Sequence, residues 1–119
     1  MRRILIIDDD PVNREIFRWA LSAEFEIHEM KSGIGAADRI SGGDYDLVLL
    51  DLMMPIVDGA EVVRDLADIN LGALARVLVV TAALNTNVTE ELNGFPLAGI
   101  EARPYDPDEI KILVGRFLQ

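Results

Sequence analysis

Carboxylates follow two separate apolar runs in this chain. The run at residues 4–7 ends in Asp8, Asp9 and Asp10, and the run at residues 47–50 ends at Asp51. Apolar runs of this length, closed by turn residues, are typical of buried parallel strands, whose carboxyl ends carry the chemistry in open sheets. Two carboxylates about 5 Å apart repel by roughly 3 kcal/mol at an effective dielectric constant near 20. If the two strands are neighbours, their acids therefore need a cation, a proton or a reaction that uses them.

The rest of the pattern alternates strands with helices. Strands are expected at residues 3–7, 25–29, 47–50, 76–80 and 98–102, and helices at residues 11–23, 32–40, 58–68, 86–93 and 107–118. Asp10, Asp58 and Asp106 each stand where a helix N-cap is expected. Such alternation implies parallel pairing through right-handed crossovers. We therefore expect an α/β fold, a flavodoxin-like doubly wound five-stranded parallel sheet of order 2-1-3-4-5 with five helices. The first and third strands then flank the switch point, where the acids fall.

The composition narrows the class of protein. A chain of 119 residues, half of them apolar, fits one compact domain that spans residues 1–119. The net charge of −10 argues against nucleic-acid binding, which needs a basic footprint. No cysteine, membrane-length apolar run or signal-peptide pattern is present, so a cytoplasmic location is expected.

Together the motifs resemble the response-regulator receiver domain of two-component signalling. The matching strings are ILIIDDDP at residues 4–11, LDLMMP at 50–55 with DG at 58–59, and VVTA at 79–82, and a basic residue before a proline stands at 103–104. A strand that ends in Asp is common, so no single string decides. The strings occur together at fitting separations, and the resemblance covers the chain from its first strand to its last helix.

The resemblance implies a role for each site residue. Asp51 would be the phosphoacceptor, taking a phosphoryl group from a histidine kinase or a histidine phosphotransfer domain. Asp8, Asp9, Asp51 and the backbone carbonyl of Met53 would hold Mg²⁺, which prefers hard oxygen ligands. The Thr81 hydroxyl would donate a hydrogen bond to a phosphoryl oxygen. Such a domain catalyses its own phosphorylation and dephosphorylation at most and is not a conventional enzyme.

Two positions depart from the family pattern. Arg103 stands where the family has a lysine, and a planar five-donor fork is not equivalent to a compact ammonium group. Ile100 stands where the family usually has a Tyr or Phe that changes position on activation, and an isoleucine is stiff at χ1. The Arg103–Pro104 peptide bond is expected to be cis, as the matching bond of the family is. These departures leave an alternative open, namely a receiver-like interaction module that does not switch by phosphorylation.

Simpler interpretations also apply to single residues. Asp8 and Asp9 could form only a turn, Asp51 could be a residue that ends a strand, and Thr81 could be a β-former. His28 is expected on the surface, away from the site. A flavodoxin-like enzyme or nucleotide binder is disfavoured, because the loop after the first strand is acidic and not glycine-rich.

The last helix suggests a partner surface. Its apolar stripe is expected to face the core and consists of Ile110, Leu113, Val114 and Phe117. Ile112 and Leu118 fall off this stripe. They could be isolated exposed residues, or they could belong to an apolar docking face for a homodimer or an effector. Tyr105 is expected to pack nearby.

Overall fold

The structure is a computed structural model that describes residues 1–82, 84–104 and 106–118. It is built on a five-stranded parallel sheet of order β2-β1-β3-β4-β5, which confirms the expected fold class. The strands are β1 (Arg3–Ile7), β2 (Glu26–Met30), β3 (Leu47–Asp51), β4 (Val77–Thr81) and β5 (Gly99–Ala102).

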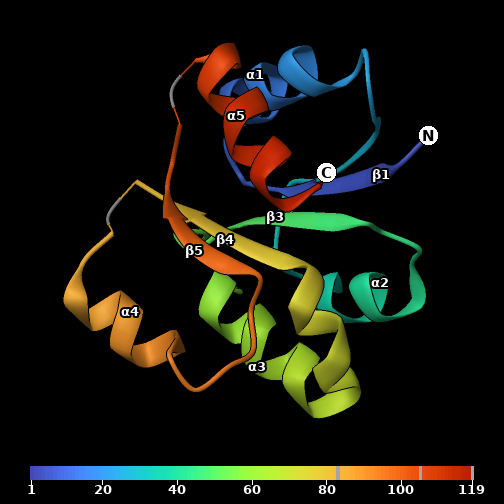
Figure 1. The fold of residues 1–119 in the computed structure, drawn as a ribbon. Coiled ribbons are helices and arrows are strands. Elements are labelled where there is room, and N and C mark those ends of the chain that lie inside the picture. The colour runs from blue at the N-terminus through green and yellow to red at the C-terminus, as the bar shows by residue number, and fades with distance from the viewer. Residues whose placement is uncertain (83, 105, 119) are drawn as a thin grey trace.

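Helices cover both faces of the sheet (Figure 1). The α-helices of the described residues are α1 (Pro11–Leu21), α2 (Ala36–Gly42), α3 (Gly59–Asn70), α4 (Thr86–Leu92) and α5 (Pro107–Phe117). Helices α1 and α5 lie side by side on one face, and α2, α3 and α4 lie on the other (Figure 1). None of these helices combines the length and apolar character needed to cross a bilayer.

The strand sequences explain the two cores. Ile4 and Ile6 point into the core beneath α1 and α5, whereas Leu5 and Ile7 point into the core beneath α2 and α3. Successive side chains of a strand alternate between the two faces of a sheet, so a strand buried on both faces must be apolar throughout. This requirement accounts for the unbroken apolar runs.

Helix starts follow the predicted caps, except in α2. The Oδ1 atoms of Asp10, Asp58 and Asp106 accept hydrogen bonds from backbone N–H groups of the first turns of α1, α3 and α5, at 2.8–2.9 Å. Helix α2, however, begins at Ala36 and not near residue 32. Gly35 has a φ of 75° and turns the chain immediately before the helix, so the loop uses more residues than the sequence suggested.

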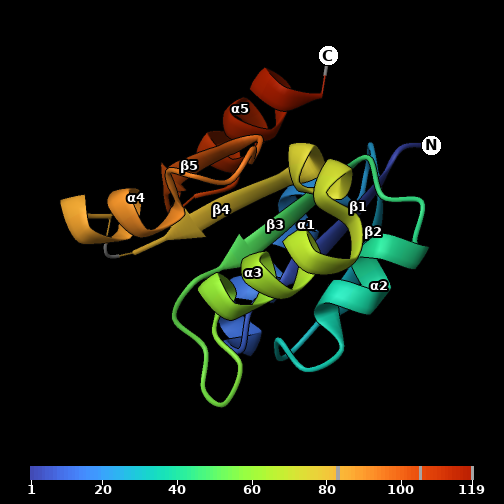
Figure 2. The same cartoon turned by 90° about the horizontal axis from the view of Figure 1, so that it is seen from below.

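A 3₁₀ helix, η1 (Leu71–Arg76), follows α3 and was not predicted. In α5 the predicted stripe faces the core, because Ile110, Leu113 and Val114 are buried and Phe117 is partly buried against them. Ile112 is exposed as expected, whereas Leu118, expected off the stripe, also packs partly buried against this core. Figure 2 shows the start of β1 and the end of α5 at the edge of the sheet opposite the long loop between β3 and α3.

Candidate functional site: an acidic pocket at the carboxyl edge of the sheet

Strand register brings the predicted acids together. Ile7 pairs with Leu50, and the residue that follows each of them is an aspartate. One carboxylate oxygen from each of Asp8, Asp9 and Asp51 lies within 4.8 Å of the other two. Asp8 and Asp51 are only 3% and 2% exposed, whereas Asp9 is exposed. We call these three residues and their surroundings the acidic pocket.

Backbone hydrogen bonds fix the loop after β1. The Asp10 N–H donates to Asp8 Oδ1 at 2.9 Å, and the Asp8 N–H donates to the Met30 carbonyl at 3.1 Å. The Arg14 Nη1 donates to the Asp8 carbonyl at 2.7 Å. Sequence reasoning missed Arg14, since a single arginine in a helix carries no signal of a tertiary contact. The Asp8 backbone is therefore held by β2 and α1, and its carboxylate by the loop after β1.

Close packing fixes Asp51 from the other side. A Cβ atom at Gly59 would lie 2.5 Å from the Asp51 carbonyl oxygen and 2.7 Å from the Leu52 Cα. Only glycine lets the start of α3 approach the strand end this closely. The Met53 N–H donates to Asp51 Oδ1 at 3.3 Å, so the backbone of Met53 reaches the pocket while its side chain is exposed.

Arg103 supplies the positive charge of the acidic pocket. Its Nη2 lies 2.8 Å from Asp51 Oδ1 and 3.5 Å from Asp8 Oδ2, and its side chain is 14% exposed. The Arg103 Nε is buried and has no hydrogen-bond partner among the described residues. One arm of the guanidinium fork is thus engaged by the acids, and another donor is without an acceptor.

The predicted cis Arg103–Pro104 bond is wrong, because no peptide bond between described residues is cis. The trans form is the more stable one for an X–Pro bond by about 0.5–1 kcal/mol. A long arginine side chain reaches Asp51 from the trans backbone, so the pocket contact does not require the cis form.

The acids have altered proton affinities. Burial, the largest cause, and the nearby charge of Asp8 together raise the pKa of Asp51 to about 6, although the charge of Arg103 opposes the rise. Burial also raises the pKa of Asp8, against the hydrogen bond from the Asp10 N–H and the charge of Arg103. The positive charge of one arginine therefore does not compensate for the burial of these carboxylates.

Thr81 completes the pocket edge. It ends β4 and is fully buried, and its carbonyl accepts a hydrogen bond from the Arg103 N–H at 2.9 Å. Ile100 is half-buried and packs against the core beneath α3. Tyr105 lies outside the described residues.

His28 lies on β2, away from the acidic pocket. It is half-buried and contacts the Tyr45 hydroxyl at 3.0 Å and the Glu26 carboxylate at 2.9 Å. It is therefore tied into local polar contacts, less exposed than the sequence suggested, and is not part of the site.

Comparison with known proteins identifies the family. Residues 4–114 match the response regulator receiver domain, so the chain belongs to this family and is a receiver domain of two-component signalling. The response regulator MprA of Mycobacterium sp. (strain KMS) is 39% identical over 115 residues, which make up 96% of this chain and 48% of that protein. The chain therefore spans about half the length of this relative. The chemotaxis protein CheY of Halobacterium salinarum is 36% identical over 73 residues, or 60% of this chain and 61% of that protein.

Solved structures support the same fold. The chemotaxis protein CheY4 of Vibrio cholerae superposes with a TM-score of 0.86 at 21% identity and 99% coverage of both chains. The response regulator TrrA of Thermotoga maritima has a TM-score of 0.79 at 28% identity, with 99% of this chain and 100% of that chain covered.

Proposed function

We propose that this receiver domain, spanning residues 1–119, accepts a phosphoryl group on Asp51 and transmits the change by a conformational shift. Its donor would be a histidine kinase or a histidine phosphotransfer domain, and the proposed location of the receiver is the cytoplasm. The observation that carries the proposal is the position of Asp51, a buried carboxylate at the switch point, beside two further acids and an arginine.

The proposed step is nucleophilic transfer to a carboxylate. A carboxylate oxygen of Asp51 forms a bond to the phosphorus of a phosphohistidine, while the phosphorus–nitrogen bond breaks and its electron pair stays on the donor's imidazole. The product is an acyl phosphate. The attack needs the ionised carboxylate, and a pKa of about 6 leaves Asp51 mostly ionised at neutral pH.

The chemistry of the donor set fits Mg²⁺. Mg²⁺ takes hard oxygen ligands and is typically held by one or two carboxylates, waters and substrate phosphate oxygens. Asp8, Asp9 and Asp51 provide such oxygens, and the Met53 carbonyl is the proposed fourth protein ligand. When bound, the ion would neutralise charge on the transferring phosphoryl group. The Thermotoga maritima relative was determined in complex with Mg²⁺-BeF, which supports this assignment.

Arg103 and Thr81 would bind the phosphoryl oxygens. The Arg103 Nη2 already contacts the Asp51 oxygen, and its buried Nε lacks an acceptor that a phosphoryl group could supply. Arginine binds phosphate bidentately, with strong charge-assisted hydrogen bonds. We propose that the Thr81 hydroxyl donates to a third oxygen. Replacement of lysine by arginine would thus change the geometry of phosphoryl binding and preserve its charge.

Acetyl phosphate with Mg²⁺ tests the proposal, read by intact mass. We expect the parent protein to gain one phosphoryl group and Asp51→Asn to gain none. Asp58→Asn is the matched control, because Asp58 caps α3 in the same loop and should leave phosphorylation intact. A gain of mass by Asp51→Asn equal to that of the parent would refute the assignment of Asp51.

The metal assignment has its own test. Titration with Mg²⁺ should raise the thermal midpoint of the parent protein, because a ligand that binds only the folded state stabilises it. Asp9→Ala should weaken this response. If Asp9→Ala binds Mg²⁺ as tightly as the parent, the metal site is wrongly placed.

The apolar surface of α5 is the proposed site for a second receiver copy. A groove of about 430 Å³ runs beside exposed Ile112 and includes Arg103 and Pro104, so it adjoins the acidic pocket. Sedimentation of the beryllofluoride-treated protein should show self-association that Ile112→Glu abolishes. If both proteins stay monomeric at high concentration, this face does not mediate self-association.

The alternative of a non-switching interaction module rested on Arg103 and Ile100. Arg103 contacts Asp51 directly, as a phosphoryl-binding cation should, and the comparisons give the alternative no support. Because position 100 holds an isoleucine and not an aromatic residue, we propose that the conformational change passes from Thr81 to the surface by a different route.

A further inference from the structure

A second concave site lies on the opposite side of β1 from β3. It is a groove of about 600 Å³ between α1, the end of β2 and α2. We call it the basic groove, and its lining consists of Arg14, Arg18, Glu29, Met30, Lys31, Ser32 and Arg39.

The charge of the basic groove is opposite to that of the molecule. The chain carries 21 acids and 11 basic residues, yet four of those basic residues and only one acid, Glu29, line this groove. A groove lined by charged residues in the proportions of the whole chain would contain more acids than basic residues. The excess of positive charge in a concavity favours an anionic ligand, since such a cleft focuses the electrostatic potential.

The cations come from three separate elements and are partly pre-positioned. Glu29 pairs with the Arg14 Nε at 3.3 Å and with the Arg18 Nη1 at 2.7 Å, so one carboxylate holds both guanidinium groups on one side of the groove. Arg39 donates from Nε to the Tyr45 hydroxyl at 3.1 Å. Lys31 has no ion pair within the described part of the chain.

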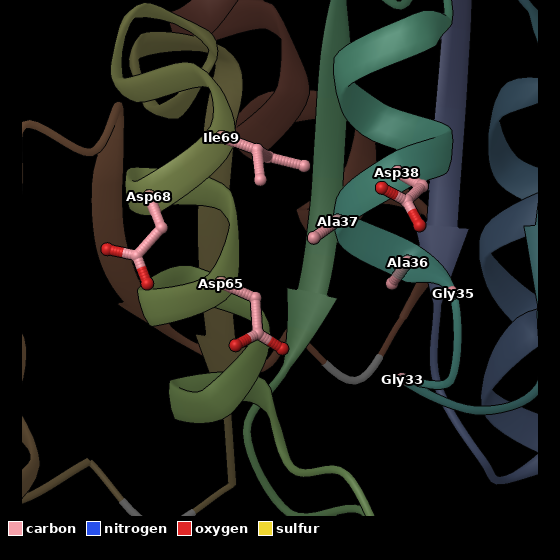
Figure 3. A pocket seen from close by; sticks show the side chains of 8 residues that line it. All are labelled: Gly33, Gly35, Ala36, Ala37, Asp38, Asp65, Asp68 and Ile69. Atoms are coloured by element: carbon pink, nitrogen blue, oxygen red, sulfur yellow. The ribbon is translucent and has the colours of Figure 1, made fainter.

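The other side of α2 provides a contrast. A cleft of about 300 Å³ between α2 and α3 is lined by Asp38, Asp65 and Asp68 together with small residues and Ile69 (Figure 3). Two adjacent concavities of opposite charge share one short helix. An anion would be repelled from the acidic cleft and attracted to the basic groove.

We propose that the basic groove binds a small anion that carries at least two phosphate charges. The guanidinium groups match the geometry of phosphate oxygens, and the Lys31 ammonium group, on the segment after β2, adds a further positive charge. The volume of the groove lies within the range of small-molecule sites. Phosphorylation of Asp51 plays no part in this binding. The groove nevertheless adjoins the acidic pocket, because Arg14 contacts both Glu29 and the Asp8 carbonyl.

Inorganic pyrophosphate is the probe for this proposal. The full chain is titrated in buffer without Mg²⁺, since pyrophosphate chelates that ion, and binding is followed by ¹H–¹⁵N chemical shifts and calorimetry. We expect saturable binding with the largest shifts at Lys31 and Ser32. The affinity should fall as salt is added, because the contacts are electrostatic.

Charge variants locate the site. Arg18→Gln with Lys31→Gln removes two groove cations but leaves Arg14 on the Asp8 carbonyl, so the acidic pocket is not disturbed. This double variant should bind pyrophosphate about tenfold or more weakly, because it loses charge-assisted hydrogen bonds. Arg64→Gln with Lys111→Gln is the matched control, with the same loss of charge elsewhere on the surface and parent-like affinity expected.

Any of three results with pyrophosphate would overturn the proposal, as would one result with a peptide. The three are the absence of saturable pyrophosphate binding, equal weakening by the two double variants, and shifts centred on Asp38 and Asp65. Binding of an acidic peptide by a protein that does not bind pyrophosphate would likewise assign the groove to a protein partner and refute the small-anion site.

Discussion

The centre of the sheet and its β5 edge are built differently. Every residue of β3 and β4 is buried, whereas β5 is half-buried and ends at the exposed Ala102. Helix α4, on the same edge, fully buries only Leu92. The acids of the acidic pocket lie at the ends of the central strands β1 and β3, but Arg103 follows the edge strand β5. The proposed signal therefore starts in the rigid part of the molecule and reaches the loosely packed part through one arginine and Thr81. Local opening is drawn from regions with few buried apolar contacts.

Matched core truncations should show the largest difference. Leu49→Ala removes a side chain that is 1% exposed in β3, and should cost about 4 kcal/mol of unfolding free energy. Leu97→Ala removes a half-buried side chain just before β5 and should cost about half as much, because the site already contacts solvent. Denaturant unfolding measures both. Equal costs would remove the distinction between centre and edge.

The contact between α3 and β3 gives the next largest effect. Gly59→Ala places a methyl group against the Asp51 carbonyl and should destabilise the protein by about 2 kcal/mol, because backbone atoms cannot yield easily. Gly115→Ala is the control. Apart from its chain neighbours and the backbone of its own helix, no atom of the described residues lies within 4 Å of its new Cβ. Because alanine also favours a helix, the substitution should stabilise α5 slightly. A Gly59→Ala variant as stable as the parent would show that the centre of the sheet is not rigid.

The charge of Asp51 should make the metal-free protein less stable as the pH rises. Between the ordinary pKa of 3.8 and the folded value of about 6, the folded state keeps a proton that the unfolded state releases. Stability therefore falls across this window and stays lower above it. Asp51→Asn should gain about 1–2 kcal/mol over the parent at pH 7 and little at pH 4. Asp68→Asn, an exposed substitution on α3, should show no such trend, and thermal unfolding from pH 4 to 8 measures both.

The loop after β3 should yield the smallest effect. Ile56 is 87% exposed and has a φ of 69°, a left-handed conformation that is costly for a β-branched residue. Ile56→Asn should stabilise the protein by about 1 kcal/mol, since asparagine tolerates this conformation. Ile34→Asn, at another exposed isoleucine whose φ is not positive, should give no gain in urea unfolding. A gain at both positions would attribute the effect to polarity and not to the backbone.

The sequence was sufficient for the central elements because their signals are local and strong. Apolar runs that end in acids predicted β1 and β3, and the alternation of strands and helices predicted that these two strands are neighbours. The late start of α2 and the backbone of Ile56 could not be predicted, because each depends on the path of a loop. The family resemblance led us to expect that Arg103 could pair with Asp51. The contact of Arg14 with the Asp8 carbonyl was beyond pattern reasoning, since only the folded chain determines which oxygen a long side chain reaches.

Chemical identification of the phosphorylated residue tests the central proposal most directly. Borohydride reduces an acyl phosphate of aspartate to homoserine, so treatment of the protein after acetyl phosphate and Mg²⁺ marks the acceptor in a peptide map. We predict homoserine at position 51 and unmodified aspartate at positions 8 and 9. Homoserine at Asp8 or Asp9, or its absence from a protein that has gained a phosphoryl group, would contradict the assignment of Asp51 as the phosphoacceptor.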